Sequence, residues 1–305
     1  MMKVLHIGNV AGVASLLIRG LKDRGIKAQM IERKKHPYRF PSETVVDSSV
    51  ISFLFYVLKL SQDYDIVHLH SLPYSLLFNI DILAFKALRS KLVVHLHGTE
   101  LRECHNKVST KVALGICDQV LISTPDLFLY YPKALWLPNP VDPVFKSLEN
   151  PQRYGKALYF RKWYEPEGER IVRMKCEEMG LELTVPNSPI RYSEMPLLLN
   201  QFEVFFDRFN ITSLSKTALE ALACGCKVIS WRGLIKDPEK ILKEHNLEDV
   251  TRKLIEIYEK MVGHRKSRAG GESVLLGSLI TFSASPTVNH TLGNSLGGFV
   301  SFFGH

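Results

Sequence analysis

Long apolar segments and paired cysteines are what this sequence lacks. No uninterrupted apolar run approaches the roughly 18 residues that span a bilayer. The first residues (Met1–Gly8) show no charged region followed by a long apolar stretch and a cleavage site. The five cysteines are odd in number and irregularly spaced, and Cys224-Gly-Cys226 is one residue short of a C-x-x-C motif. We therefore expect a cytoplasmic protein with reduced thiols.

Acidic residues are outnumbered by basic ones, with 31 Asp and Glu against 39 Lys and Arg. A basic excess favours an anionic partner such as nucleotide phosphates or an anionic lipid surface. Peripheral contact with the inner membrane face is therefore one alternative to an ordinary solvated surface. Nucleic acid is not expected as a partner, because the basic residues are scattered and no zinc-finger, homeodomain or RNA-binding signature is present.

Short apolar runs alternate with longer amphipathic stretches along most of the chain. Runs such as Lys3–Ile7, Asp65–Leu69 and Lys91–Leu96 predict strands, and stretches such as Val13–Arg24 and Val50–Ser61 predict helices. Strands of about five residues joined by helices longer than about ten indicate βαβ units and a parallel sheet. The predicted fold class is therefore α/β, with doubly wound, Rossmann-like domains.

A proline-rich segment, Leu137–Phe145, interrupts this alternation. Its three prolines exclude a helix or a central strand and predict an interdomain hinge. The alternation then resumes, so we expect two Rossmann-like domains, residues 1–146 and 147–262. Their sheets would face an interdomain cleft with their carboxyl ends, where ligands of open α/β sheets bind. Residues 263–305 are rich in Gly and Ser and predict an irregular or poorly ordered tail.

A glycine-containing turn, Gly8–Ala14, follows the first predicted strand and leads into a helix. Such a turn can present backbone N–H groups and the positive end of the helix dipole to a phosphate. It is not a G-x-G-x-x-G motif, so Gly12 could equally serve the geometry of the turn.

Two histidine pairs, His68-Leu-His70 and His95-Leu-His97, stand near the ends of predicted strands. Residues two apart in a strand share a face, so the members of each pair project together. No Asp, Glu or Cys completes a recognisable metal-binding spacing, and we therefore expect no bound metal. His97 is favoured instead as a donor to a substrate hydroxyl, because Gly98-Thr99 lets the chain turn and the ring face the cleft.

In the second half, Arg161-Lys162 follows directly on the predicted strand Ala157–Phe160. Two cations at a strand end could neutralise a diphosphate leaving group as its charge develops, and a solvated strand end is the alternative. Further on, Ser213 or Ser215 would cap a helix that carries Glu220 among Ala and Leu residues. A carboxylate in such an apolar helix needs a partner, which could be a ribose diol or a nearby Arg or Lys.

Four segments, taken in order, resemble the group 1 family of retaining GT-B glycosyltransferases. The resemblance covers nearly all of residues 2–262. Asp65–His70 resembles the family's D-V-V-H strand, and Val93–Glu100 resembles its V-V-x-T-x-H-G-x-D strand and loop. Pro138–Asp142 resembles the P-N-G-V-D hinge, with Pro140 in place of the glycine, and Leu219–Gly225 resembles L-E-A-M-A-C-G.

The resemblance implies a role for each matched residue. Gly12 would lie near the donor phosphates, and His97 would touch the transferred sugar. Arg161, with Lys162 assisting, would hold the diphosphate, and Glu220 would bind the ribose. Thr212 stands where the family has the glutamate that addresses the donor hexose. With Ser215 and Lys216 it completes the expected donor-binding set.

We therefore expect a hexosyltransferase-like enzyme that moves a sugar from a nucleotide diphosphate sugar with retention. The acceptor would be a glycan, a lipid or a small molecule, and neither a cofactor nor a metal would be required. One alternative is a nucleotide-sugar 2-epimerase of the same fold. Another is a degenerate member that binds a sugar or a partner without turnover, which Thr212 and the unusual tail motivate.

Overall fold

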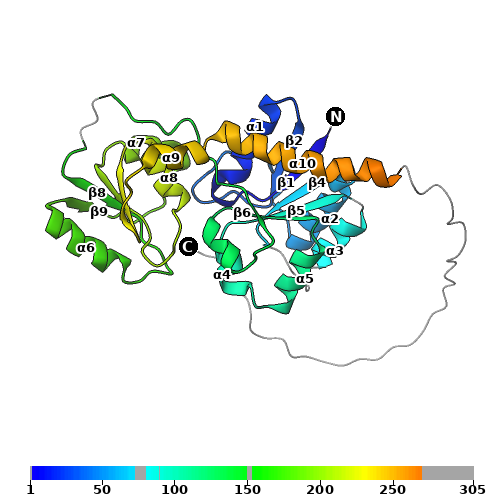
Figure 1. Cartoon of the computed structure of the whole chain (residues 1–305), viewed down its shortest axis with the longest axis horizontal. Coiled ribbons are helices and arrows are strands. Elements are labelled where there is room, and N and C mark those ends of the chain that lie inside the picture. Colours follow the sequence, from blue (N-terminus) through cyan, green and yellow to red (C-terminus); the bar gives the residue numbers. More distant parts are fainter. Residues whose placement is uncertain (1, 73–79, 89, 150–152, 270–305) are drawn as a thin grey trace, which may run out of the picture. The chain divides into compact units, whose positions relative to one another are not determined.

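The computed structural model describes residues 2–72, 80–88, 90–149 and 153–269. Residues 1–266 form one compact unit, and a second unit, residues 267–305, lies almost wholly outside the described part. The first unit contains two β-sheets with helices packed against them (Figure 1). The predicted α/β class with two sheets is confirmed.

The first sheet has seven strands in the order β3-β2-β1-β4-β5-β6-β7, and all its pairings are parallel, as predicted. The strands are β1 (Lys3–Ile7), β2 (Lys27–Glu32), β3 (Thr44–Val45), β4 (Ile66–His70), β5 (Lys91–Leu96), β6 (Gln119–Ile122) and β7 (Leu135–Trp136). The register sets His6 beside His68 and His70 beside His95. The three central strands therefore align their histidines.

Helices cover both faces of this sheet, because its strands alternate apolar residues toward each side. The helices and 3-10 turns of this half are η1 (Val10–Gly12), α1 (Val13–Asp23), α2 (Val50–Ser61), α3 (Ile80–Ala87), α4 (Thr99–Cys104), α5 (Val108–Ile116) and η2 (Pro125–Leu129). Leu5 and Ile7 pack toward α2, α3 and α5, whereas Val4 packs toward α1. His6, two residues from Val4, lies on the α1 side. From the sequence a helix is also predicted over Tyr74–Arg89, and this range falls partly outside the described residues.

The second sheet has five strands in the order β12-β11-β10-β8-β9, parallel except for the short edge strand β12. The strands are β8 (Lys156–Tyr159), β9 (Glu182–Thr184), β10 (Val204–Phe206), β11 (Lys227–Ser230) and β12 (Gly233–Leu234). Its helices are α6 (Gly168–Met179), η3 (Tyr192–Glu194), α7 (Met195–Leu199), α8 (Lys216–Ala223) and α9 (Pro238–Glu244). Apolar residues on its two faces form two separate clusters.

The last helix, α10 (Leu247–Ala269), belongs by its packing to the first sheet (Figure 1). Val250, Leu254, Ile257 and Tyr258 are buried with residues of α1, β1 and β4. The sequence analysis grouped this helix with the second domain, because its amphipathic period shows that a face is buried but not against which partner. The helix also runs to Ala269, seven residues into the segment expected to be an irregular tail.

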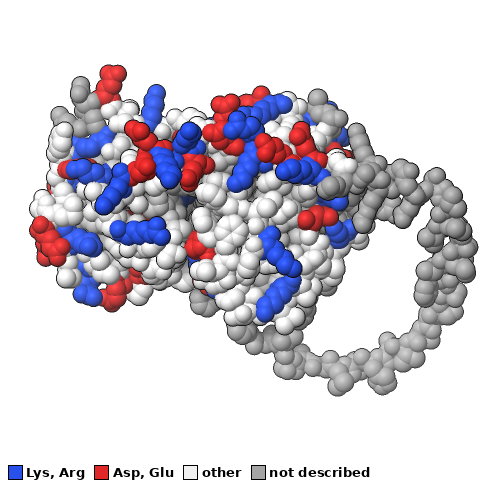
Figure 2. Space-filling view, in the orientation of Figure 1, with Lys and Arg blue, Asp and Glu red and all other residues white. Residues whose placement is uncertain are grey.

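None of the described helices is long and apolar enough to span a membrane. On the face drawn in Figure 2, basic and acidic side chains of the described residues are interspersed rather than separated by sign. Peripheral contact with a membrane therefore stays a prediction.

Candidate active site

The carboxyl ends of β8 and β10 bring two mostly buried cations together. Lys162 follows β8, donates from Nζ to the carbonyl of Phe160 and lies over the Tyr159 ring, 4.4 Å from its centroid. Burial lowers the pKa of Lys162, although the carboxylate of Asp207 acts to raise it. Arg208 follows β10, and only 9% of it is exposed. Lys162 and Arg208 thus place positive charge at the carboxyl ends of the strands, where ligands of open α/β sheets bind.

Arg208 organises the loop before helix α8. Its guanidinium donates to the carbonyl of Ser213 at 3.0 Å, to the Ser213 hydroxyl at 2.8 Å and to the carbonyl of Leu214 at 3.1 Å. Asp207 accepts a hydrogen bond from the backbone N–H of Ser215 through Oδ2, while its buried Oδ1 has no hydrogen-bond partner among the described residues. Arg208 was not predicted as a site residue, although it stands two residues after the end of a strand, as Arg161 does.

Ser215, one of the two residues predicted as possible caps, caps α8 by accepting a hydrogen bond from the N–H of Ala218. The positive end of this helix therefore lies beside Arg208 and Asp207, at the carboxyl ends of the same strands. Thr212, in the preceding loop, is exposed.

Glu220 is buried in α8, where its side chain pairs with that of Lys216 one turn earlier. This is the nearby cation that the sequence left open as an alternative to a ribose. Burial raises the pKa of the Glu220 carboxyl, and Lys216 opposes that shift. Lys216 also lies over the Tyr192 ring, 5.1 Å from its centroid.

Arg161 points away from these groups. Its guanidinium pairs with Glu169 on α6 and donates to the Asn187 side chain, and about half of the Arg161 side chain is exposed. Lys162, which was expected only to assist, is the more buried member of the pair. The contact of Arg161 with a diphosphate therefore stays a prediction.

Gly12 ends the turn after β1 with a φ of 73°, which favours glycine, and forms the N-cap of α1. A Cβ at this position would lie 2.7 Å from a ring carbon of Phe40. Phe40 in turn packs on Tyr192, with ring centroids 5.1 Å apart. Gly12 is thus linked to Lys216 and Glu220 through two aromatic rings, and close packing alone accounts for the glycine.

A second chain of contacts joins the ends of β5 and β10. Arg102 on α4 makes a salt bridge of 2.7 Å with Asp126 in η2. Burial acts to raise the pKa of Asp126, but hydrogen bonds from Arg102, Thr124 and Ser213 outweigh it and hold the pKa below its usual value. Ser213 is also a partner of Arg208. Residues from both halves of the chain thus meet at Ser213.

His97 lies at the end of β5 and is half-buried. Its backbone N–H and that of Gly98 donate to the two carboxylate oxygens of Glu100. Gly98 has a φ of 135°, and a Cβ there would overlap the guanidinium of Arg102. The sharp turn predicted after His97 is confirmed.

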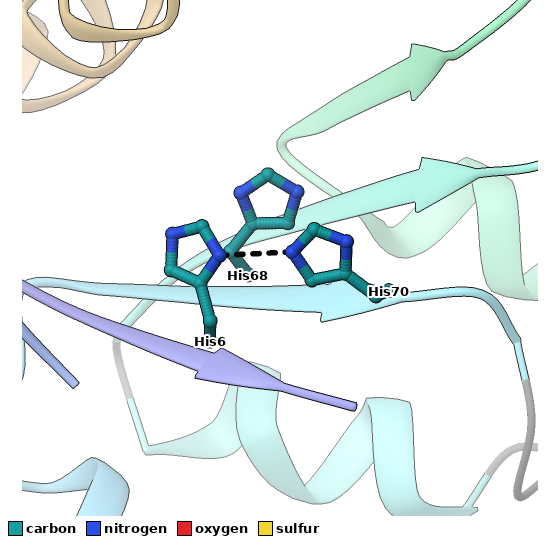
Figure 3. Close-up of side chains that lie close together, drawn as sticks. All are labelled: His6, His68 and His70. Carbon is teal, nitrogen blue, oxygen red and sulfur yellow. Dashed lines mark hydrogen bonds between the residues drawn. The ribbon is translucent and has the colours of Figure 1, made fainter. Parts of the chain in front are cut away.

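His97 is also the outermost of five neighbouring imidazoles on the α1 and α10 side of the sheet. His6 Nδ1 and His70 Nε2 are 2.8 Å apart (Figure 3), and His70 Nδ1 and His97 Nε2 are 3.2 Å apart. Tyr258 on α10 places its hydroxyl 3.1 Å from His6 Nε2 and 2.5 Å from His68 Nδ1. The sequence showed the two pairs, but not that His6 and Tyr258 join them.

Burial keeps these imidazoles neutral at ordinary pH. It lowers the pKa of His6 to about 3 and that of His97 to about 4. The pKa values of His68, His70 and His95 also lie well below the usual value, first through burial and then through neighbouring histidines. Neutral rings keep a lone pair that can accept a hydrogen bond or bind a metal.

A surface cavity of about 750 Å³ lies at the opposite, amino ends of β1 and β2, between Lys3, Lys27 and Tyr64. Ligands of open α/β sheets bind at the carboxyl ends, so we do not assign this cavity to the active site.

No protein-family model and no curated protein matches the chain. Among solved structures it resembles sucrose-phosphate synthase from Thermosynechococcus elongatus, with a TM-score of 0.57 and 13% identity over 87% of this chain and 100% of that one. An alpha-glucosyltransferase in complex with UDP and a 13-mer DNA gives a TM-score of 0.56 at 13% identity, over 76% of this chain and 80% of that one.

The chain has the GT-B fold. This GT-B chain also resembles UDP-GlcNAc 2-epimerase from Methanocaldococcus jannaschii, with a TM-score of 0.50 and 11% identity over 85% of this chain and 100% of that one. At such identities the likeness concerns the fold. Membership of the retaining group 1 family stays a prediction, as do the roles of the individual residues.

Proposed function

We propose that this GT-B protein transfers a sugar from a nucleotide diphosphate sugar to an acceptor hydroxyl, with retention at the anomeric carbon. The observation that carries the proposal is the pair of largely buried cations, Lys162 and Arg208, beside the capped start of α8. Buried charge is costly unless it is paired. Asp207 and Glu165 already act on Lys162 at the carboxyl ends of these strands. A diphosphate bound there would add further negative charge opposite the two cations.

In the proposed reaction the bond between the anomeric carbon and the diphosphate oxygen breaks, and the diphosphate keeps the electron pair. The acceptor oxygen forms the new bond, and its proton passes to the departing diphosphate. Lys162, Arg208 and the α8 dipole would stabilise the developing charge, with Arg161 turning inward to assist. Catalysis would then depend on positioning and leaving-group stabilisation, without a cofactor.

The other expected contacts belong to the same proposal. Ribose hydroxyls would donate to Glu220 Oε2, while Oε1 keeps its bond to Lys216. Gly12 would lie by the phosphates, and His97 would touch the transferred sugar. The acceptor would be a glycan, a lipid or a small molecule. The glycosyltransferase neighbours in the comparison support this class of reaction through the shared fold.

The test is nucleotide affinity followed by turnover. UDP and UDP-glucose are suitable first probes, measured by calorimetry and by release of free UDP with a panel of acceptors. Glu220→Gln should weaken nucleotide binding about 10- to 100-fold, since a hydrogen bond to a charged group contributes roughly 1.5–3 kcal/mol.

Glu203→Gln is the matched control. Glu203 precedes β10, at the amino ends of the strands and thus away from the proposed site, and it pairs with Lys227. It should bind nucleotide like the unmodified protein. Unchanged affinity and turnover in Glu220→Gln would contradict the proposed donor site. Absence of any nucleotide binding would favour the degenerate, non-catalytic alternative.

The second candidate is a nucleotide-sugar 2-epimerase, favoured by the shared fold with the Methanocaldococcus enzyme. Such an enzyme would convert its nucleotide sugar without an acceptor. Product analysis with the acceptor withheld separates the two: a changed sugar still attached to the nucleotide indicates epimerisation, and no reaction indicates transfer.

A further inference from the structure

The parallel register converges three ring nitrogens at the carboxyl ends of β4 and β5. His70, His95 and His97 each offer one nitrogen, and these atoms lie within 4.8 Å of one another. His70 Nδ1 and His97 Nε2 are 3.2 Å apart. Two nitrogens bound to one tetrahedral zinc ion at 2.0–2.1 Å would be separated by about 3.3 Å. The spacing of this pair therefore suits a shared metal ion.

His95 provides a second, independent observation. The residue is completely buried, and neither of its ring nitrogens has a hydrogen bond of ordinary geometry to the described residues, although the backbone carbonyl of Leu137 acts on the ring. A buried polar group without a partner costs roughly 1–3 kcal/mol. A buried ring without an ordinary hydrogen bond thus stands where the three histidines meet.

Each of the three rings also has a polar group for its other nitrogen. His70 Nε2 faces His6 Nδ1 at 2.8 Å (Figure 3), the backbone carbonyl of Leu137 acts on His95, and the Asn139 side chain acts on His97. Histidines that ligate metals usually donate their second N–H to such a partner, which fixes the orientation of the ring. This arrangement matches that pattern.

We propose that His70, His95 and His97 bind a transition-metal ion at the carboxyl end of the first sheet. Three imidazoles without a thiolate or carboxylate suit Zn²⁺, Co²⁺, Ni²⁺ or Cu²⁺ rather than Mg²⁺ or Ca²⁺. Three protein ligands leave a fourth position for water or a substrate oxygen. The half-buried ring of His97 gives an ion access from the surface.

The deeper trio, His6, His68 and His70, is the weaker candidate (Figure 3). Its members are at most 1% exposed, so an ion would have no direct path to them. We assign this trio and Tyr258 to the support of His70.

The test uses Co²⁺ and Zn²⁺ on the full chain after treatment with a chelator and desalting, with no nucleotide sugar present. One Co²⁺ per chain should bind with the visible d–d absorption of a tetrahedral site, and Zn²⁺ should displace it. His95→Gln and His97→Gln should each weaken binding more than about 100-fold, the upper end for loss of an outer partner.

His105→Gln is the control, because His105 ends α4 and hydrogen-bonds to the carbonyl of Leu101 outside the trio. It should keep the affinity of the unmodified chain. The site would be refuted by a cobalt spectrum without the tetrahedral band, or by unchanged affinity in both variants. If a variant fails to fold, the spectrum of the unmodified chain still decides. Because nucleotide sugars are absent, failure here leaves the proposed transferase activity untouched.

Discussion

Acidification from about pH 7.5 to about pH 5.5 should destabilise the metal-free chain far more than an average protein. The reason is the row of buried imidazoles, His6, His68, His70, His95 and His97, whose pKa values burial holds well below 6.5, to about 3 for His6 and about 4 for His97. In the unfolded chain these rings take up protons near pH 6.5, while in the folded chain they stay neutral. Their contribution to stability is therefore complete above about pH 6.5 and is lost as the pH falls below it.

Each such ring lowers the free energy of unfolding by about 1.4 kcal/mol per pH unit below its unfolded pKa. The five rings together give about 7 kcal/mol between about pH 7.5 and about pH 5.5, against a total stability of roughly 5–15 kcal/mol for a typical protein. Burial raises the pKa of Glu32, Glu100 and Glu220, and these carboxyls offset part of the loss. The net result is a large loss of stability at a mildly acidic pH.

The assay is urea denaturation followed by circular dichroism at about pH 7.5, 6.5 and 5.5, with a chelator present. His6→Gln removes one titrating ring, so its loss of stability over this range should be smaller by about 1.4 kcal/mol. The reasoning fails if the free energy of unfolding of the unmodified chain stays within about 1 kcal/mol over this range.

Further substitutions test the packing by urea denaturation. Lys216→Met should lower the free energy of unfolding by about 3–5 kcal/mol, because it leaves the buried Glu220 carboxylate unpaired. Adding Glu220→Gln to this variant should restore most of the lost stability. A Lys216→Met variant as stable as the original would contradict the buried pair. Gly20→Ala should cost about 1–3 kcal/mol, because its Cβ would overlap the Thr251 side chain where α1 meets α10. Gly115→Ala in α5 is the control, because open space surrounds the new Cβ, and it should raise the free energy of unfolding by about 0.5–1 kcal/mol. Equal effects of Gly20→Ala and Gly115→Ala would argue against the docking of α10.

Local signals predicted most of the regular elements. The bounds of β1, β5 and α2 were predicted to the residue, because a change of hydrophobic period coincides there with a turn or a cap. The short strands β3 and β12 were missed, since two residues carry no period and become strands only by pairing with a neighbour. Helix α9 was missed as well, although Asp237 caps it and Pro238 begins it.

The candidate active site was predicted in part. Glu220 was expected to be buried with a partner, and the structure selects Lys216. Lys162 and Arg161 are adjacent in sequence, yet one is buried against Tyr159 and the other is held outside by Glu169. Which of two neighbouring cations turns inward depends on the loop geometry after β8, and no sequence pattern reports it.

The sequence by itself determined the α/β class and the two-sheet organisation, because hydrophobic period and proline placement act over a few residues. Only the tertiary structure decided that α10 returns to the first sheet and that His6, from the first strand, joins the histidines of β4 and β5. Strand register and helix docking depend on residues far apart in the chain, such as Tyr258 and His6, which are 252 positions apart. The five imidazoles become one cluster only when that register is set.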